Sequence, residues 1–395
     1  MNGADVVLGV AVATGLYAFL GYPAILRLAG ALRRERPSYP LPSDWPTISI
    51  TLPVYNGEDV IGATLERILE LDYPPDKRQI LVVSDGSTDR SEAIVRGFAD
   101  RGVELLSLSP RRGKSAAENA AASVLRGEIV INTDASVRIR RDAIRPLVAA
   151  LADPEVGVAS SRDVSVARLG AEANEGEGSY VGYEMAVRDL ETRVSGIVGA
   201  SGCLYAIRST LHRVTIPEEL SRDFSAPLLA RRAGYRSVSV PQALCEVPRG
   251  TSLRQEYRRK VRTMARGLRT MWWLRDLLDP RRYGGFALMV WSHKICRWLL
   301  PWTMVLGAVA LAMLATEFLW ARAAVAVIGV LAAMALVGWH RPQGKRLPRP
   351  VVWAAFFFAG NIAVLHAWLV AFGGSDTAMW EPTRRTAAAD ASARH

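Results

Sequence analysis

The sequence predicts an α/β domain with a mostly parallel, doubly wound sheet, attached to transmembrane and interfacial α-helices. Two observations lead to this fold class. From Thr47 onward, short apolar runs alternate with helical patterns, as in folds built from strand–helix–strand units. Near both ends of the chain, long segments are almost free of charged residues, and 50% of the 395 residues are hydrophobic, which is high for a wholly soluble protein.

The α/β domain is expected at residues 45–250. Between its first two strands, Ile61, Leu65 and Ile68 form the apolar stripe of a helix, which ends before Pro74. After about residue 155 the pattern loosens into a helix at 180–194, a glycine-rich loop at 199–202 and a strand at 203–207, which should form the second wall of a ligand cleft. The first four strands are expected at 47–54, 79–84, 103–108 and 128–132.

Four segments are long and apolar enough to cross a hydrocarbon core of about 30 Å. The first, at 6–26, predicts an N-terminal anchor within residues 1–32, and three others predict a C-terminal bundle at 298–374. Arginines at 27–36 and basic residues at 341–349 flank these segments, so the positive-inside rule predicts a cytoplasmic α/β domain. A multi-pass protein of a bacterial-type inner membrane is expected. The tail at 375–395 is expected to be largely disordered.

Residues 251–297 are expected to form amphipathic helices at the membrane interface. In the stretch 253–274, apolar residues such as Val261 and Leu268 recur every three or four positions and share one face. Arg259, Arg262 and Arg266 fall on the opposite face. An apolar stripe with a basic face is typical of a helix that lies in the plane of the membrane.

The charge balance points to membrane lipids as partners. The net charge is +11, from 49 Lys and Arg against 38 Asp and Glu, and much of the excess lies beside apolar segments. Anionic lipids explain this distribution better than nucleic acid, so no nucleic-acid partner is expected. The three cysteines are far apart in the sequence and lack metal-ligand spacing, which argues against a structural zinc site.

Two acidic residues stand where predicted strands end. Asp85 follows the second strand, and Asp134 follows the fourth. In open α/β sheets, ligands bind beyond the carboxyl ends of the strands, where carboxylates can hold a ribose or a divalent metal. This pattern favours a nucleotide-diphosphate donor. Alternatively, Asp85 and Gly86 only form a turn, and Thr88 or Asp89 caps the next helix.

Several motifs together resemble family 2 glycosyltransferases, specifically the membrane-integrated branch that includes hyaluronan, chitin-oligosaccharide and poly-N-acetylglucosamine synthases. The resemblance covers roughly residues 45–275 and implies a domain of the GT-A type. It depends on the order and spacing of the motifs, not on any one of them. They are Pro53-Val-Tyr-Asn56, Val82-Val-Ser-Asp85-Gly-Ser-Thr-Asp89, Gly113-Lys-Ser-Ala-Ala-Glu-Asn119, Thr133-Asp134-Ala135-Ser136, Gly199-Ala-Ser-Gly202 and Arg222-Asp223.

The resemblance also implies roles for residues on the donor side. Tyr55, Glu58 and Asp85 would bind the uridine, and Lys114 would approach the nucleotide. Asp134 would help to hold Mg²⁺ or Mn²⁺ on the diphosphate. Here the sequence departs from the family, because the usual Asp-x-Asp pair is Asp134-Ala135-Ser136. Ser136 would then reach the metal through water, or another residue would complete the shell.

On the acceptor side, the resemblance implies that Asp223 removes the proton of the acceptor hydroxyl, with inversion at the sugar. A helix N-cap is the alternative role for this residue. Ser201 and Gly202 resemble the loop that flanks the acceptor. Arg262, with Arg259 as a second cation, would contact the diphosphate, although both arginines could instead bind lipid headgroups.

The sequence thus predicts a membrane-bound inverting glycosyltransferase of the hexosyltransferase type. It would transfer a sugar from a UDP-sugar to a growing polysaccharide or a lipid-linked glycan. One alternative is a single addition to a polyprenyl-phosphate-linked acceptor, because the Gln and Trp of the processive Gln-x-x-Arg-Trp motif are missing. Another is a non-catalytic scaffold that binds nucleotide-sugar. Three C-terminal spans are few for a polymer channel, so a homo-oligomer is also considered.

Overall fold

In the computed structural model, the described residues are 3–32, 39–166, 175–248, 252–340 and 347–373. They form two compact units. The α/β unit contains residues 39–166 and 177–248, and the helical unit contains 3–32, 175–176, 252–340 and 347–373. The tail at 375–395, predicted to be disordered, lies outside the described residues.

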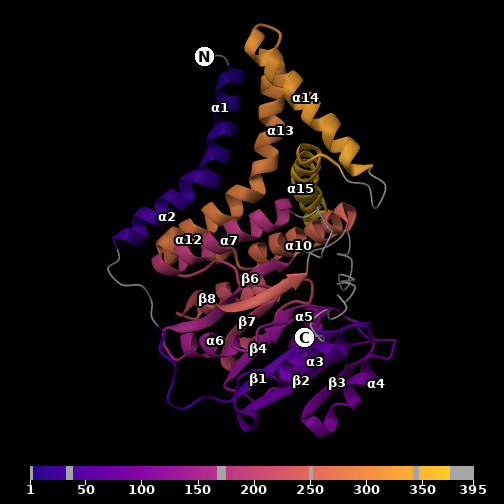
Figure 1. Cartoon of the computed structure of the whole chain (residues 1–395). Helices are drawn as coiled ribbons and strands as arrows, with labels where there is room; N and C mark the ends of the chain where they lie inside the picture. Colours follow the sequence, from indigo (N-terminus) through magenta and orange to yellow (C-terminus); the bar gives the residue numbers. More distant parts are fainter. Residues whose placement is uncertain (1–2, 33–38, 167–174, 249–251, 341–346, 374–395) are drawn as a thin grey trace, which may run out of the picture. The chain divides into compact units, whose positions relative to one another are not determined.

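One eight-stranded sheet organises the α/β unit, in the order β3-β2-β1-β4-β7-β6-β8-β5 (Figure 1). Its first four strands in space, β3 to β4, are all parallel, and β6 pairs with β8 in parallel as well. The predicted mostly parallel sheet is therefore confirmed. The strands are β1 (Ile48–Val54), β2 (Arg78–Asp85), β3 (Val103–Leu108), β4 (Ile129–Thr133), β5 (Arg138–Ile139), β6 (Val156–Val166), β7 (Leu204–Arg208) and β8 (Arg236–Pro248).

Helices cover both faces of this sheet. Alternate residues of β2 enter different cores: Ile80 and Val82 pack in one cluster, and Leu81 and Val83 in the other. A strand buried on both faces reads as a continuous apolar run, which is why the first strands were recognisable in the sequence. The helices of this unit are α3 (Ile61–Leu69), α4 (Ser91–Arg96), α5 (Lys114–Ala121), α6 (Ile144–Leu151), α7 (Glu175–Val194), α8 (Ser209–His212) and α9 (Arg222–Arg232).

Two long strands were not predicted. β6 carries small and polar residues, such as the buried Ser160 and Ser161, so it lacks an apolar run. β8 contains Pro241, which normally argues against an internal strand. The pairing between β6 and β8 is irregular there, since Ser161 pairs with Val240 and the next residue pairs with Leu244. Such an irregularity accommodates a residue without an N–H group.

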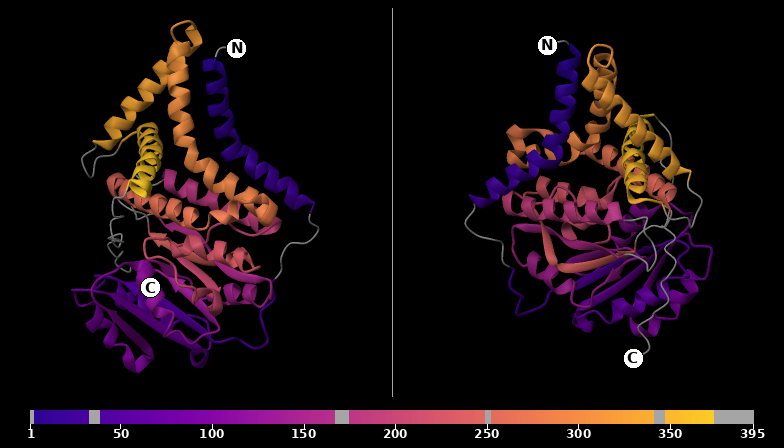
Figure 2. Two further views of the ribbon diagram at one scale, coloured as in Figure 1. Left: turned by 180° about the vertical axis from the view of Figure 1, so that it is seen from behind. Right: turned by 45° about the horizontal axis from the view of Figure 1, so that its top comes forward.

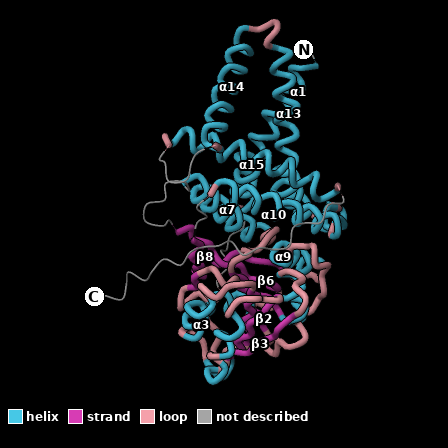
Figure 3. The backbone as a smooth tube through the Cα atoms, turned by 90° about the vertical axis from the view of Figure 1, so that its right-hand side faces the viewer, coloured by secondary structure: helices cyan, strands magenta, loops and turns pink. Residues whose placement is uncertain are grey.

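Helices joined by loops form the described part of the helical unit (Figure 3). Four stretches are long and apolar enough to cross a membrane, judged by length and composition: Gly3–Ala31, Gly285–Leu314, Leu319–Trp339 and Arg349–Phe372. The second begins at Gly285, earlier than the expected position 298. The helices are α1 (Gly3–Leu16), α2 (Tyr22–Ala31), α10 (Leu253–Trp273), α11 (Pro280–Tyr283), α12 (Gly285–Val290), α13 (Cys296–Leu314), α14 (Leu319–Trp339) and α15 (Arg349–Phe372).

Close helix pairs hold this unit together. α1 lies beside α13, where a Cβ added to Gly307 would lie 2.8 Å from the Cβ of Ala11 (Figure 2). Small residues allow such close approach of membrane helices. The predicted amphipathic helix is α10, and it packs along α15. The Arg269 guanidinium donates to the carbonyls of Val370 at 3.0 Å and Ala371 at 3.1 Å, so it caps the C-terminal end of α15.

Candidate active site

The loop after β3 is fixed by the carboxylate at the end of β2. Asp85 is only 1% exposed, and its two oxygens accept the backbone N–H groups of Arg112 and Gly113, each at 2.8 Å. The next residue, Gly86, has a φ of +68°, and an added Cβ would lie 3.0 Å from the backbone nitrogen of Arg111. Asp85 therefore shapes the loop that leads into Lys114.

Tyr55, a predicted uridine ligand, lies under this loop. The guanidinium carbon of Arg111 is 3.5 Å from the centre of the Tyr55 ring, a stacked cation–π arrangement. The Arg111 Nε is also 3.9 Å from Asp85. Tyr55 and Asp85, predicted on separate strand ends, are thus brought together by Arg111, a residue that the sequence reasoning did not single out.

The loop after β1 is held against the loop after β2. Asn56 has a φ of +45°, and its side-chain oxygen accepts the Thr88 N–H at 2.8 Å. The Glu58 N–H donates to Asp89 at 3.0 Å, and the Glu58 carboxylate pairs with the Arg90 Nε at 3.3 Å. Asp89 also accepts from Ser91 in the first turn of α4. Glu58 is therefore engaged in an exposed ion pair, while Asp89 accepts the N–H of Ser91, the first residue of α4, whose N-cap is Arg90.

Lys114 links the predicted metal ligand to the predicted acceptor loop. Its Nζ lies 2.5 Å from Asp134 Oδ1 and donates to the carbonyl oxygen of Gly202 at 3.3 Å. Burial by itself would lower the pKa of the Lys114 ammonium. The carboxylates of Asp134, Glu118 and Asp223 outweigh burial, so the pKa is raised and the side chain stays charged.

Asp223 lies in the first turn of α9, and its carboxylate approaches Gly202, the residue whose carbonyl accepts from Lys114. Its Oδ1 accepts the Phe224 N–H at 2.9 Å and the Ser221 hydroxyl. Its Oδ2 would lie 2.7 Å from a Cβ added to Gly202, so a larger residue at this position would push the carboxylate aside. The main-chain N–H of Ala200 donates to the Asp223 carbonyl at 3.3 Å, which ties the acceptor loop to α9.

The other predicted residues of this unit have different surroundings. Ser201 is 1% exposed, and its hydroxyl donates to Asp163 at 2.6 Å. Burial raises the pKa of Asp163, against the nearby Arg188. Ser201 therefore holds the shape of the loop. Ser136 lies two residues after Asp134 and is partly exposed, and the Ala135 carbonyl between them accepts from Thr64 at 2.8 Å.

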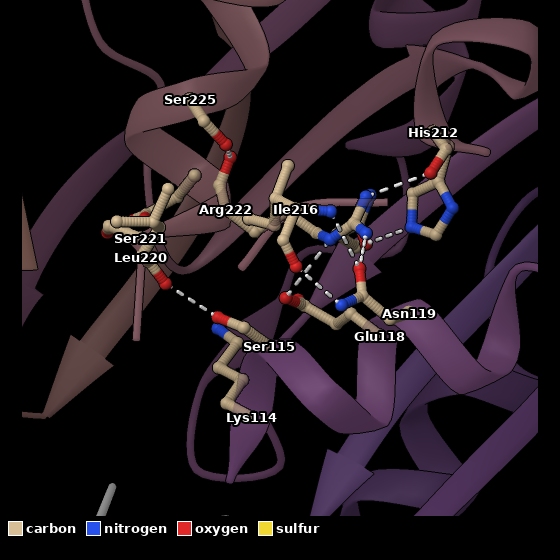
Figure 4. A network of polar contacts seen from close by, with 12 residues as sticks. Lys114, Ser115, Glu118, Asn119, His212, Ile216, Leu220, Ser221, Arg222 and Ser225 are labelled. Atoms are coloured by element: carbon tan, nitrogen blue, oxygen red, sulfur yellow. Dashed lines mark hydrogen bonds and ion pairs between the residues drawn. The ribbon is translucent and has the colours of Figure 1, made fainter. Parts of the chain in front are cut away.

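A buried network of hydrogen bonds and ion pairs joins α5 to α9 (Figure 4). The Arg222 guanidinium donates to the His212 carbonyl at 2.9 Å and to the side-chain oxygen of Asn119, and its Nε lies 3.8 Å from Glu118. Burial raises the pKa of Glu118, although Lys114 and Arg222 oppose this. Burial, and then Arg222, hold the pKa of His212 well below its ordinary value. The network fixes the residue that directly precedes Asp223.

Sequence reasoning did not assign this network a role. Asn119 is the last residue of the motif that begins at Gly113. In the structure, its side chain donates to the Ile216 carbonyl at 2.8 Å and accepts from the Ile216 N–H at 3.3 Å. Asn119 lies one helical turn after Ser115, whose hydroxyl donates to the Leu220 carbonyl at 2.7 Å. This spacing, which places both polar side chains on one face of a helix, is the sequence pattern that could have indicated the network. Both side chains tie α5 to the segment that leads into α9.

The two predicted arginines of the amphipathic helix belong to the helical unit. Arg259 is paired with Glu256, one turn earlier on α10, at 2.7 Å. Arg262 is partly exposed on the same helix. Their proposed contact with the diphosphate remains a prediction.

The donor set at Asp134 suits a divalent cation that shares its shell with a ligand. Across residues 3–32, 39–166, 175–248, 252–340 and 347–373, no three His, Cys, Asp or Glu side chains are grouped to hold a metal ion. Asp134 and Ser136 offer hard oxygen donors, which Mg²⁺ and Mn²⁺ prefer. Mg²⁺ commonly uses one or two carboxylates together with substrate phosphates, so these residues fit such a site.

Comparison with known proteins identifies the class. Residues 49–192 match the family model described as glycosyl transferase family 2. Residues 49–192 thus form a region similar to family 2 glycosyltransferases, the family that the motifs indicated, and the names of the relatives indicate an enzyme of the hexosyltransferase type. Its fold is of the GT-A type. A mannosyltransferase from Pyrobaculum calidifontis, solved in complex with GDP-Man and Mn²⁺, superimposes with a TM-score of 0.69 and 24% identity, covering 93% of this chain and 100% of that one.

Two curated relatives illustrate the range of similar proteins. An N-acetylglucosaminyltransferase of Rhizobium meliloti is 27% identical over 325 residues, which are 75% of this chain and 73% of that protein. An undecaprenyl-phosphate 4-deoxy-4-formamido-L-arabinose transferase of Edwardsiella ictaluri is 35% identical over 115 residues, which are 27% of this chain and 35% of that protein. For that second relative, the similarity is therefore limited to about a third of its length.

Proposed function

We propose that this chain is a membrane-bound inverting glycosyltransferase that transfers a sugar from a UDP-sugar to a growing polysaccharide or a lipid-linked glycan. One observation carries the proposal. Lys114 joins Asp134 to the Gly202 carbonyl, and the Asp223 carboxylate lies directly against the same glycine. Lys114 and Asp134, proposed to act on the donor, and Asp223, the candidate base, are thus brought together at Gly202 in the acceptor loop.

Asp223 Oδ2 is the proposed base atom. Oδ1 is engaged by Phe224 and Ser221, whereas Oδ2 accepts no hydrogen bond within the described α/β unit. As the acceptor oxygen bonds to the anomeric carbon of the donor sugar, its proton would pass to Oδ2, and the bond to the departing diphosphate would break. Attack by the acceptor oxygen on the face opposite the leaving group, assisted by a base that takes its proton, gives inversion.

The donor side would neutralise the leaving group. Asp134 and Ser136 would hold Mg²⁺ or Mn²⁺, and the bound metal would supply charge stabilisation to the departing diphosphate. Lys114 would bind a phosphate oxygen through its ammonium, and Tyr55, Glu58 and Asp85 would form the uridine site. Arg259 and Arg262 would add positive charge from α10.

The acceptor separates the main proposal from its rival. The match to an N-acetylglucosaminyltransferase over most of both chains supports a sugar transferase and leaves the main proposal, a growing polysaccharide or lipid-linked glycan, in place. The shorter match to an undecaprenyl-phosphate transferase supports the rival, a single addition to a polyprenyl phosphate. In either case, the apolar helices would anchor the enzyme in the bacterial inner membrane, with the α/β unit in the cytoplasm.

The proposal is tested with purified full-length protein in detergent. UDP-sugars are screened with Mn²⁺, using chitin oligosaccharides and undecaprenyl phosphate as acceptors, and the product is sized. Asp223→Asn should bind UDP with Mn²⁺ like the wild type but transfer at least about a hundredfold more slowly. Turnover near the wild-type rate would place the base elsewhere. If no UDP-sugar is turned over while UDP still binds, the scaffold reading replaces the catalytic one.

A further inference from the structure

We propose that, in the ligand-free enzyme, the Lys114 ammonium occupies the place of the divalent cation on Asp134. A cation then binds this carboxylate only together with a nucleoside diphosphate, which draws the ammonium away. This inference rests on the proposed metal role of Asp134. It adds a second role for Lys114, in which the residue controls when the metal binds.

The ion pair is short and largely enclosed. Lys114 Nζ lies 2.5 Å from Asp134 Oδ1, and the two side chains are only 18% and 23% exposed. A second N–H of the ammonium donates to the Gly202 carbonyl at 3.3 Å. Lys114 is the first residue of α5, directly after Gly113, whose N–H is held by Asp85. The hydrogen bond from Gly113 to Asp85 therefore fixes the backbone that positions Lys114 beside Asp134.

Charge decides which cation the carboxylate holds. A divalent cation on Asp134 would face the Lys114 ammonium across a few ångströms in a partly enclosed place, where like charges repel strongly. The described residues provide no group of three His, Cys, Asp or Glu side chains to compensate. The metal alone is therefore a poor competitor for Asp134.

A diphosphate removes both obstacles. Its oxygens complete the metal shell, as substrate phosphates do in many Mg²⁺ sites. Its negative charge also gives the ammonium a new partner, since lysine is a common phosphate ligand. The lysine would exchange its carboxylate for a phosphate while the metal takes the carboxylate. Metal and nucleotide should therefore each strengthen the binding of the other, by the same factor.

The test measures Mn²⁺ binding to the full-length protein in detergent, from the electron paramagnetic resonance signal of free Mn²⁺, with and without UDP. Lys114→Met keeps much of the aliphatic stem and removes the charge, and Lys114→Gln is a second variant in case the first unfolds. Lys77→Met is the matched control. Lys77 also forms an ion pair with an aspartate, but that aspartate, Asp44, is exposed and is not part of the proposed metal site. Asp134→Ala reports on the site itself.

For the wild type, Mn²⁺ should bind weakly alone and at least tenfold more tightly with UDP. In the Lys114 variants, Mn²⁺ alone should bind at least tenfold more tightly than to the wild type. The increase in Mn²⁺ affinity caused by UDP should be smaller than in the wild type. Lys77→Met should behave as the wild type. Unchanged or weaker binding of Mn²⁺ alone in both folded Lys114 variants would overturn the inference. If Asp134→Ala binds Mn²⁺ with UDP as the wild type does, the proposed metal site itself fails.

Discussion

Replacing Gly202 by alanine should separate the position of the base from the stability of the fold. The added Cβ would lie 2.7 Å from Asp223 Oδ2, while ordinary contacts begin at 3.4 Å, so the oxygen must move by about 0.7 Å. Because Oδ2 is the end of a side chain, the carboxylate can rotate, at a cost of roughly 0.5 to 1.5 kcal/mol in stability. A shift of about 1 Å at a reacting group costs about a hundredfold in rate.

We therefore expect Gly202→Ala to transfer on the order of tenfold to a hundredfold more slowly, with unchanged affinity for UDP and Mn²⁺. Single-turnover transfer and calorimetric UDP binding measure the two quantities. Gly62→Ala is the control, because this glycine is inside α3 and its new Cβ would make an ordinary contact of 3.6 Å with Ile94. That variant should keep the wild-type rate. Wild-type transfer by Gly202→Ala would refute the reasoning about Asp223.

Three further predictions concern other parts of the chain. Asp134→Ala should lose Mn²⁺-dependent UDP binding but keep its fold, and an unchanged calorimetric affinity would remove it from the metal site. Arg269→Ala should destabilise the helical unit by roughly 1.5 to 3 kcal/mol in a detergent melt, because two carbonyls at the end of α15 lose a charged donor. Arg262→Ala should slow transfer. Because the folded protein holds the pKa of His212 well below 6.5, the unfolded chain binds its proton first, and stability should fall as pH drops below about 6.5. His212→Gln should show a shallower loss over that range, and an equal slope would contradict this origin.

Local patterns determined the first strands and the long apolar helices of this protein. The first strands are buried on both faces, so a run such as Ile80 to Val83 is apolar at every position and needs no tertiary information to be recognised. The four long apolar segments are equally local. The motifs around Asp85, Lys114, Asp134 and Asp223 also indicated the family, since their order and spacing are properties of the sequence.

Only the tertiary structure decided how those residues meet. The strands β6 and β8 escaped notice because buried small and polar residues and Pro241 carry no apolar period, and their pairing is set by neighbours distant in the chain. The contact of Asp223 with Gly202, and the ion pair between Lys114 and Asp134, join residues from different helices and loops. Burial, hydrogen bonding and charge balance depend on three-dimensional surroundings, so spacing along the chain can nominate these groups but does not determine their contacts.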